Sequence, residues 1–142
     1  MMDTEQIKKE LGAGAAFSVG EKNDAFAKYF IGQSYLHMLS LERVVIGNVT
    51  FEPGCRNNWH IHHKGGQILL VTAGKGYYQE WGKEPQELHP GDVVNIPPEV
   101  KHWHVASSDR WFALIAVEVP AEGASNEWCE PVTDEEYAAV NA

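Results

Sequence analysis

Cysteine is scarce in this sequence. Only two cysteines, Cys55 and Cys129, occur in 142 residues, and they lie far apart with no CxxC pair. Neither a disulfide framework nor a cysteine-based zinc site is therefore indicated, and we expect two free thiols. A chain of this length can bury a hydrophobic core without covalent cross-links, so one ordinary globular domain is expected.

Basic residues are fewer than acidic ones, and long apolar segments are absent from the sequence. The 11 Lys and Arg residues face 20 Asp and Glu residues, which gives a formal net charge of -9. Sequence-independent binding to nucleic acid needs clustered cations, so nucleic acid is not an expected partner. The N-terminal segment lacks the basic-then-apolar order of a secretory signal, and no apolar run reaches membrane-spanning length. We expect a cytoplasmic protein with no membrane partner.

Short runs of β-branched and aromatic residues, separated by turn residues, fill the middle of the chain. Typical separators are Glu52-Pro53-Gly54 and His89-Pro90-Gly91-Asp92. No long helical period lies between the runs, which argues against parallel βαβ units and favours an all-β sandwich or barrel. The expected strands are 44–51, 67–72, 76–81, 93–96 and 111–119.

Helices are expected only near the two ends. The first residues carry helix formers and end before Gly12-Ala13-Gly14, which we expect to be a flexible joint. Near the C-terminus, Thr133 and Glu136 have the spacing of a capping box, which predicts a short helix beginning there. The expected parts of the single domain are an N-terminal helical or irregular arm over 1–35, a barrel over 36–122 and a tail over 123–142.

Four of the seven histidines form two His-x-His pairs, His60-Ile61-His62 and His102-Trp103-His104. Residues two apart in a strand share a face, so each pair can direct both imidazoles into one cavity. Neutral imidazole is the commonest protein ligand for transition metals. Two such pairs favour a shared metal, whereas a single pair is more often solvent-facing or hydrogen-bonded. The remaining histidines, His37, His63 and His89, are expected at the surface.

The spacing around the first pair resembles the first motif of the cupin family. Gly54, His60, His62 and Gly74 stand at the family's positions, and Gln67 stands where the family usually has Glu. Cupins are double-stranded β-helices of the jelly-roll type, so the resemblance implies an architecture that agrees with the strand pattern.

The second pair stands in a segment that resembles the second cupin motif. Gly91, Pro97 and His102 match, whereas Glu99 and Ala106 occupy positions where glycine and asparagine are usual. The combined resemblance covers about residues 40 to 120. It implies a cupin jelly-roll barrel with short helices at its ends, and small cupins are often homodimers, so a second copy is an expected partner.

The resemblance also implies a ligand set. His60, His62 and His102 would bind one divalent metal, Gln67 would stand at the position of the fourth ligand, and His104 would lie in the pocket beside the metal. The alternative for Gln67 is a hydrogen bond to a ligand imidazole. A neutral amide leaves the ion its full formal +2 charge, which strengthens it as a Lewis acid and disfavours oxygen activation through a ferric state.

Further segments, among them Lys101-His102-Trp103-His104 and the tail from Glu127 to Tyr137, resemble the small bacterial cupins related to manganese-dependent hydroxynitrile lyases. Relatives of that group occur with carboxymuconolactone decarboxylase-like proteins. In the lyases the metal site is three histidines and a glutamine, and the histidine two residues after the last ligand lies in the active site, which matches His104. The resemblance also implies that the lyases have a second pocket histidine at the position near Leu114. This chain has an apolar residue there, so cyanohydrin cleavage is expected to be weak or absent.

Strand alternation gives a candidate pocket face on the last long strand. Phe112, Leu114, Ala116 and Glu118 share one side of it. If that side faces the metal, the pocket is apolar around a polar floor and suits a small, partly hydrophobic substrate. The alternative is that the same side only packs against the opposite sheet.

The resemblance therefore implies a metal-dependent lyase-type enzyme that acts on a small hydroxylated or carbonyl compound, with His104 as acid and base. A non-catalytic metal or small-ligand binding module and an iron-dependent dioxygenase stay open as alternatives. The ion would be Mn, Fe, Ni, Co or Zn, with Mn favoured by the resemblance.

Overall fold

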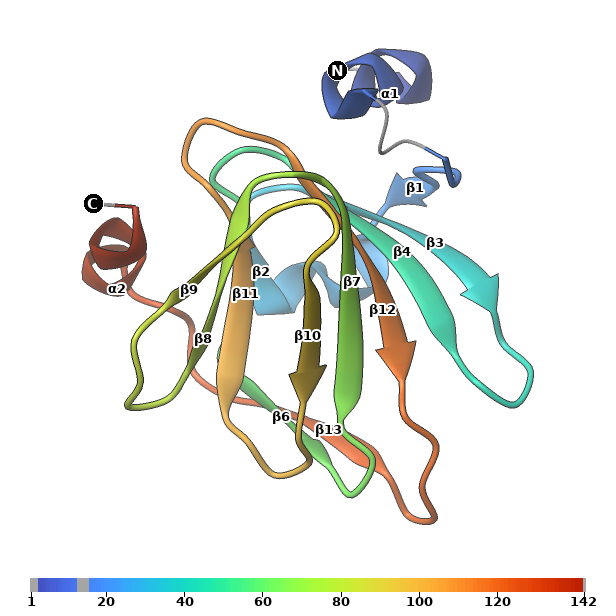
Figure 1. Cartoon of the computed structure of the whole chain (residues 1–142), viewed down its shortest axis with the longest axis vertical. Helices are drawn as coiled ribbons and strands as arrows, with labels where there is room; N and C mark the ends of the chain where they lie inside the picture. Colours follow the sequence, from blue (N-terminus) through green and yellow to red (C-terminus); the bar gives the residue numbers. More distant parts are fainter. Residues whose placement is uncertain (1–2, 13–15, 142) are drawn as a thin grey trace.

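Two antiparallel β-sheets pack face to face in the computed structural model, which describes residues 3–12 and 16–141 (Figure 1). The first sheet has six strands in the order β1 (Glu21–Lys22), β3 (Ser34–Ser40), β4 (Ile46–Phe51), β12 (Phe112–Glu118), β7 (Gln67–Gly74) and β10 (Val93–Ile96).

The second sheet has seven strands. Its main order is β13 (Ser125–Trp128), β6 (His60–His63), β11 (His102–Ala106), β5 (Arg56–Asn57) and β2 (Phe30–Ile31), while β8 (Gly76–Glu80) pairs with β11 and β9 (Gln86–Leu88) pairs with β8.

This arrangement confirms the all-β jelly roll predicted from the sequence. Among the residues that the structure describes, backbone pairing stays within each sheet, so the expected barrel is formed by two packed sheets that are not closed on each other. Strands β1 and β2 lie within the segment 1–35, and β13 lies within 123–142. Both flanking segments therefore contribute strands to the sheets.

The main core lies between the two sheets. Leu69 and Leu114 from the first sheet are fully buried with Leu88 of the second, and Phe51 and Phe112 pack beside them with ring centroids 5.7 Å apart. Burying a side chain of this size contributes about 1.5–3 kcal/mol. The alternation predicted for β12 is therefore correct, because Phe112 and Leu114 both point inward.

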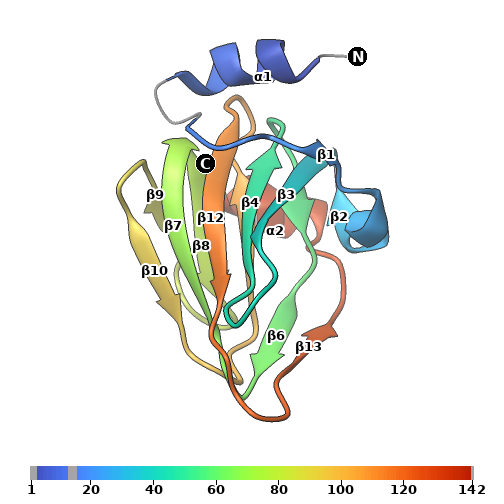
Figure 2. The ribbon, with the colours of Figure 1, turned by 90° about the vertical axis from the view of Figure 1, so that its right-hand side faces the viewer.

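Short helices close the ends of the fold. Helix α1 (Thr4–Leu11) is capped by Asp3 and lies across one end of the first sheet, where it buries Ile7 and Leu11 (Figure 2). The predicted N-terminal helix is thus confirmed. Of the joint expected at Gly12-Ala13-Gly14, the last two residues lie outside the described residues. No helix in the described ranges is long and apolar enough to cross a bilayer.

Helix α2 (Asp134–Val140) begins at the predicted capping box. The Thr133 hydroxyl accepts from the Glu136 amide, and the Glu136 carboxylate accepts in return from the Thr133 amide. The helix packs on the outer side of the second sheet, where Tyr137 donates a hydrogen bond to the Ala106 carbonyl. A 3-10 helix, η2 (Asp24–Tyr29), links β1 to β2 and was not predicted from the sequence.

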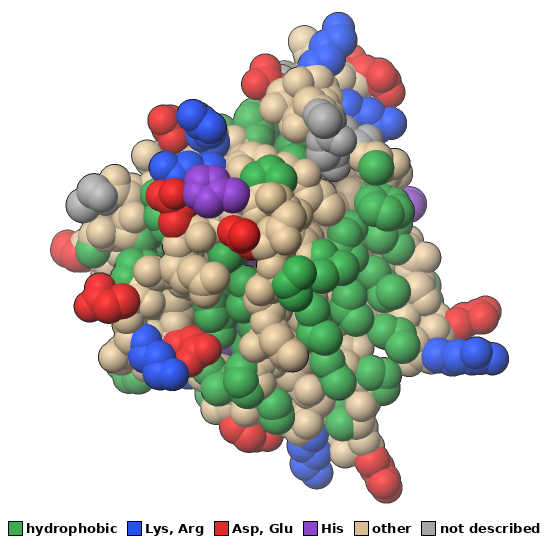
Figure 3. Space-filling view, viewed as in Figure 1, with side chains coloured by type: hydrophobic (Ala, Val, Ile, Leu, Met, Phe, Trp, Pro, Cys, Tyr) green, Lys and Arg blue, Asp and Glu red, His purple; other side chains and the backbone are tan. Residues whose placement is uncertain are grey.

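The outer face of the first sheet carries apolar side chains. Figure 3 shows hydrophobic residues gathered over this side of the molecule. Leu70 and Val93 are cross-strand partners on β7 and β10, and they are 37% and 60% exposed. The homodimer expected from the sequence stays a prediction.

A substitution at Gly74, at the end of β7, tests how closely the strands pack. Its φ is +77°, and a Cβ there would overlap the carbonyl oxygen of Trp111. We expect Gly74→Ala to lower the free energy of unfolding by about 2–4 kcal/mol, because left-handed strain and overpacking add. The measurement is urea denaturation followed by circular dichroism.

Gly54→Ala is the matched control for this prediction. Gly54 has a similar φ of +84°, but a Cβ there would meet open space. We expect a loss of only about 1 kcal/mol from backbone strain. Equal losses in the two variants would contradict the packing argument.

Candidate metal centre

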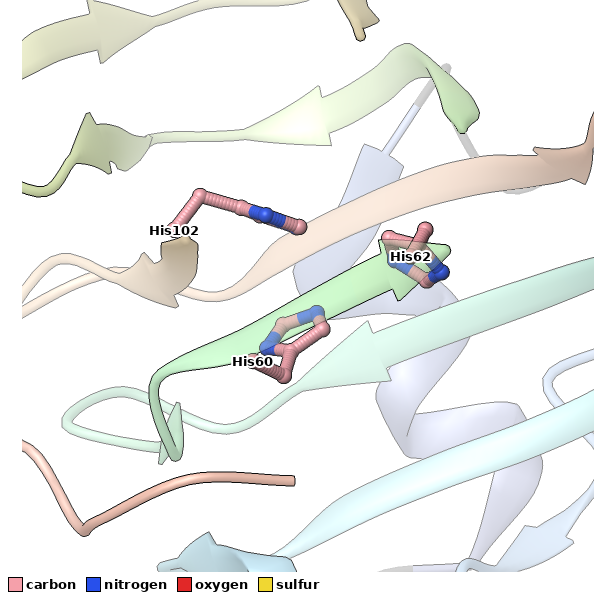
Figure 4. Close-up of side chains that lie close together, drawn as sticks. All are labelled: His60, His62 and His102. Carbon is pink, nitrogen blue, oxygen red and sulfur yellow. The ribbon is translucent and has the colours of Figure 1, made fainter. Parts of the chain in front are cut away.

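Three histidines from two paired strands converge in the interior (Figure 4). His60 and His102 are directly opposite each other in the pairing of β6 with β11, and His62 lies two residues further along β6. Their ligating nitrogens all lie within 4.8 Å of one another, and all three side chains are buried. These three histidines could therefore hold a metal ion.

Two of the three rings are oriented by backbone carbonyls. His60 Nδ1 donates to the carbonyl of Asn58 at 2.8 Å, and His102 Nδ1 donates to the carbonyl of Val100 at 2.9 Å. In each case the acceptor lies two residues earlier in the chain. Because a carbonyl only accepts, the neutral ring carries its proton on Nδ1 and keeps the Nε2 lone pair for a ligand.

The third ring is oriented by a side chain from β13. His62 Nδ1 donates to the amide oxygen of Asn126 at 2.7 Å. The same pattern follows, with the proton on Nδ1 and a free lone pair on Nε2. Asn126 was not identified from the sequence, since nothing in its local pattern indicates that β13 pairs with β6.

Several buried polar atoms at this point have no hydrogen-bond partner. They are His62 Nε2, His102 Nε2 and the amide oxygen of Gln67. Leaving such an atom buried and unpaired costs about 1–3 kcal/mol, so a group of them on one spot requires an explanation. All three are lone-pair donors of the kind that bind divalent cations, and the residues present therefore fit such an ion.

The low polarity of the interior keeps the imidazoles of His60 and His102 neutral. Burial lowers the pKa of His102 to about 4. Burial, followed by the neighbouring His102 and His104 rings, lowers the pKa of His60 well below its ordinary value. Neutral imidazole is the form that binds a metal ion.

A carboxylate that the sequence argument placed on the candidate pocket face, without assigning it a role, lies beside the site. Glu118, the last residue of β12, accepts a hydrogen bond from Gln67 Nε2 at 2.5 Å, and its other oxygen is 3.5 Å from His62 Nδ1. The charge expected from the sequence was that of the ligand set alone and did not include this carboxylate. With Gln67 the proposed ligand set carries no charge of its own, but the Glu118 carboxylate is hydrogen-bonded to the Gln67 amide.

A cavity of about 230 Å³ opens beside His60 and His62. Its polar part includes His60, His62 and Gln67, together with Asn57 and His104, and its apolar part includes side chains such as Phe30, Met38 and Trp128. The expected pocket, apolar around a polar floor, is present. From β12 it is lined by Ala116 and Glu118.

His104 lies in this cavity but outside the group of three. Its ring centroid is 5.4 Å from that of His60 and 6.0 Å from that of His102. The Asn57 side chain holds it, because Oδ1 accepts from the His104 backbone amide at 3.0 Å and Nδ2 faces the ring. Burial lowers the pKa of His104 well below its ordinary value, with His102 and His62 adding to the effect.

Leu114 lies deeper than the sequence argument placed it. It is fully buried in the core between the sheets and does not line the cavity, whose β12 side chains stand two and four residues further on. The period of a strand gives the face of a residue but not its depth. A histidine at this position would be buried among apolar side chains.

The other histidines lie at the surface, as predicted. His63 points away from the site and hydrogen-bonds to Glu99 and Glu127, with its side chain 31% exposed. His89 contacts Glu87 at the surface, and His37 is exposed. The two cysteines are both free thiols, as expected.

Comparison with known proteins adds to this geometry. Residues 47–118, about half of the chain, match the family described as Cupin domain. The chain belongs to the cupin family. A cupin-like protein from Thermotoga maritima superposes on this cupin with a TM-score of 0.82 and 41% identity, covering 88% of this chain and 96% of that one.

Two curated relatives of this cupin are enzymes by name. An (R)-mandelonitrile lyase from Granulicella tundricola is 47% identical over 90 residues, which are 63% of this chain and 68% of that protein. An acireductone dioxygenase from Bacillus pumilus is 28% identical over 79 residues, which are 53% of this chain and 42% of that protein. This cupin thus spans less than half of the dioxygenase.

The geometry makes a direct prediction about metal content. Replacing His102 with Ala removes one of the three converging ring nitrogens, so we expect the variant to lose a bound divalent metal, measured by elemental analysis after gel filtration. His63→Ala, the matched control on the opposite face of β6, should retain it. Undiminished metal in His102→Ala would contradict the ligand assignment, and loss of metal from His63→Ala would show that the register of β6 is wrong by one residue.

Proposed function

We propose that this cupin is a metal-dependent lyase-type enzyme that acts on a small hydroxylated or carbonyl compound. The observation that carries the proposal is the position of His104, a buried imidazole that lines the same cavity as His60 and His62, two of the three converging histidines. A metal that only stabilised the fold would need no further histidine in an open cavity beside it.

The proposed ligands are His60, His62, His102 and Gln67, with manganese as the favoured ion. A bound divalent ion would supply Lewis acidity toward an oxygen of the substrate. The protein's own contribution is to fix this ligand set through the contacts of the imidazole Nδ1 atoms, which hold the rings before any substrate arrives.

His104 is the proposed proton-moving residue. Asn57 Nδ2 lies 3.1 Å from its Nδ1 and 3.3 Å from its Nε2, so the amide donates to one ring nitrogen and the neutral ring carries its proton on the other. A substrate hydroxyl that displaced this contact would transfer its proton to the freed nitrogen. The ring would later return that proton to the leaving fragment.

The cavity limits the substrate to a small molecule. A volume of about 230 Å³ with largely apolar walls suits a compact, partly hydrophobic compound rather than a polymer. The identity of 47% to a protein named (R)-mandelonitrile lyase supports lyase chemistry. Cyanohydrin cleavage itself is expected to be weak or absent, because the resemblance implies a second pocket histidine in the lyases, and the β12 residues that line this cavity are Ala116 and Glu118.

Oxygen-dependent cleavage is the second candidate function. The similarity to proteins named acireductone dioxygenase favours it, and the Glu118 carboxylate beside Gln67 removes part of the electrostatic argument against an oxidised metal. The two functions can be told apart by oxygen consumption and metal requirement. A dioxygenase consumes oxygen and requires iron or a similar redox metal, whereas the proposed lyase consumes no oxygen and requires no redox metal.

The test is turnover of His104→Gln on a panel of small hydroxylated and carbonyl compounds, with metal content measured on the same samples. We expect metal content to be unchanged and turnover to fall about 100- to 10,000-fold, the range for loss of a general acid or base. His89→Gln, a surface substitution of the same kind, should change neither quantity. Unchanged turnover in His104→Gln would rule out its role and favour a binding module.

A further inference from the structure

We propose that Glu118 is a positioning residue that turns the amide oxygen of Gln67 toward the three histidines and so makes Gln67 a metal ligand. The inference rests on the metal site proposed above. It assigns a role to a residue outside the proposed ligand set.

The two side chains come from neighbouring strands in direct register. Gln67 begins β7 and Glu118 ends β12, and their Cα atoms are partners in the ladder. Gln67 Nε2 donates to Glu118 Oε1 at 2.5 Å. Because both residues stand on paired backbone positions, the contact is set by the register of the sheet.

The chemistry of this pair fixes which way the amide points. An ionised carboxylate only accepts hydrogen bonds, so the amide must present its NH₂ group to Glu118 and its oxygen to the opposite side. On that side the oxygen is buried and has no hydrogen-bond partner. An amide turned the other way would present N–H donors to the site and could not bind a cation.

Glu118 also brings negative charge to the ligand set. Its second oxygen is 3.5 Å from the Nδ1 of His62, a further member of the proposed set. Its side chain is 34% exposed and stands between the cavity of the site and an adjacent cavity of about 290 Å³ that it also lines. Glu118 thus keeps contact with solvent while it holds the buried amide of Gln67.

The experiment compares manganese dissociation constants by calorimetry for wild type and three variants. Glu118→Gln permits both amide orientations, and we expect binding to weaken about tenfold or more, the size usual for a residue that orients a ligand. The double variant Gln67→Glu with Glu118→Gln restores one acceptor and one donor in exchanged positions, and we expect it to recover most of the lost affinity. Glu122→Gln removes an exposed charge and should bind as wild type.

A double-mutant cycle with Gln67→Met separates the effect of Glu118 on the orientation of the Gln67 amide from the effect of its charge on the site. If Glu118 acts through Gln67, Glu118→Gln should have much less effect on affinity in the Gln67→Met background than in wild type. Equal weakening in both backgrounds would overturn the positioning role. Circular dichroism of each variant, together with the exchanged double variant, keeps the test valid if one substitution fails to fold.

Two negative results have different meanings. If wild type binds manganese and Glu118→Gln binds equally tightly, only the role of Glu118 is overturned. If wild type binds no manganese and His102→Ala behaves identically, the proposed metal site is overturned, and this inference with it.

Discussion

The register between β6 and β11 is the constraint on which the site depends. It sets His60 opposite His102, and the alternation of β6 then adds His62 on the same face. A slip of β6 by one residue would turn His60 and His62 to the outer surface of the sheet and bring His63 inward. The surface contacts of His63 with Glu99 and Glu127 oppose that slip, because they hold the outward-facing residue in place.

The contacts that orient the proposed ligands come from several parts of the chain. His60 and His102 use carbonyls of their own approaching segments, but His62 uses Asn126 on β13 and Gln67 uses Glu118 on β12. Both sheets and the last strand must therefore assemble before the ligand atoms point to one place. The hydrophobic core around Leu114 stabilises the fold and so offsets the cost of burying ring and amide atoms that have no hydrogen-bond partner.

Much of this arrangement could be predicted from the sequence. Strand alternation predicted that each His-x-His pair shares a face, and the resemblance to the cupin motifs implied that His60, His62 and His102 come together, as they do. The capping-box spacing of Thr133 and Glu136 predicted α2. Alternation and capping depend on residues that are close in the sequence, whereas the pairing of β6 with β11 was implied only by the resemblance. Glu99, which stands where the family usually has glycine, has a φ of +70°, a backbone conformation that was not predicted from the sequence.

The features that could not be predicted depend on distant segments. Asn57, Asn126 and Glu118 act through contacts across strand pairs, and a local pattern does not show which strands pair. Leu114 was placed on the correct face, but its depth below the cavity depends on how the sheets pack. X-ray absorption spectroscopy of the manganese-loaded protein tests the central claim most directly: the account predicts scattering from three imidazoles with an oxygen ligand, and a spectrum without imidazole scattering would contradict it.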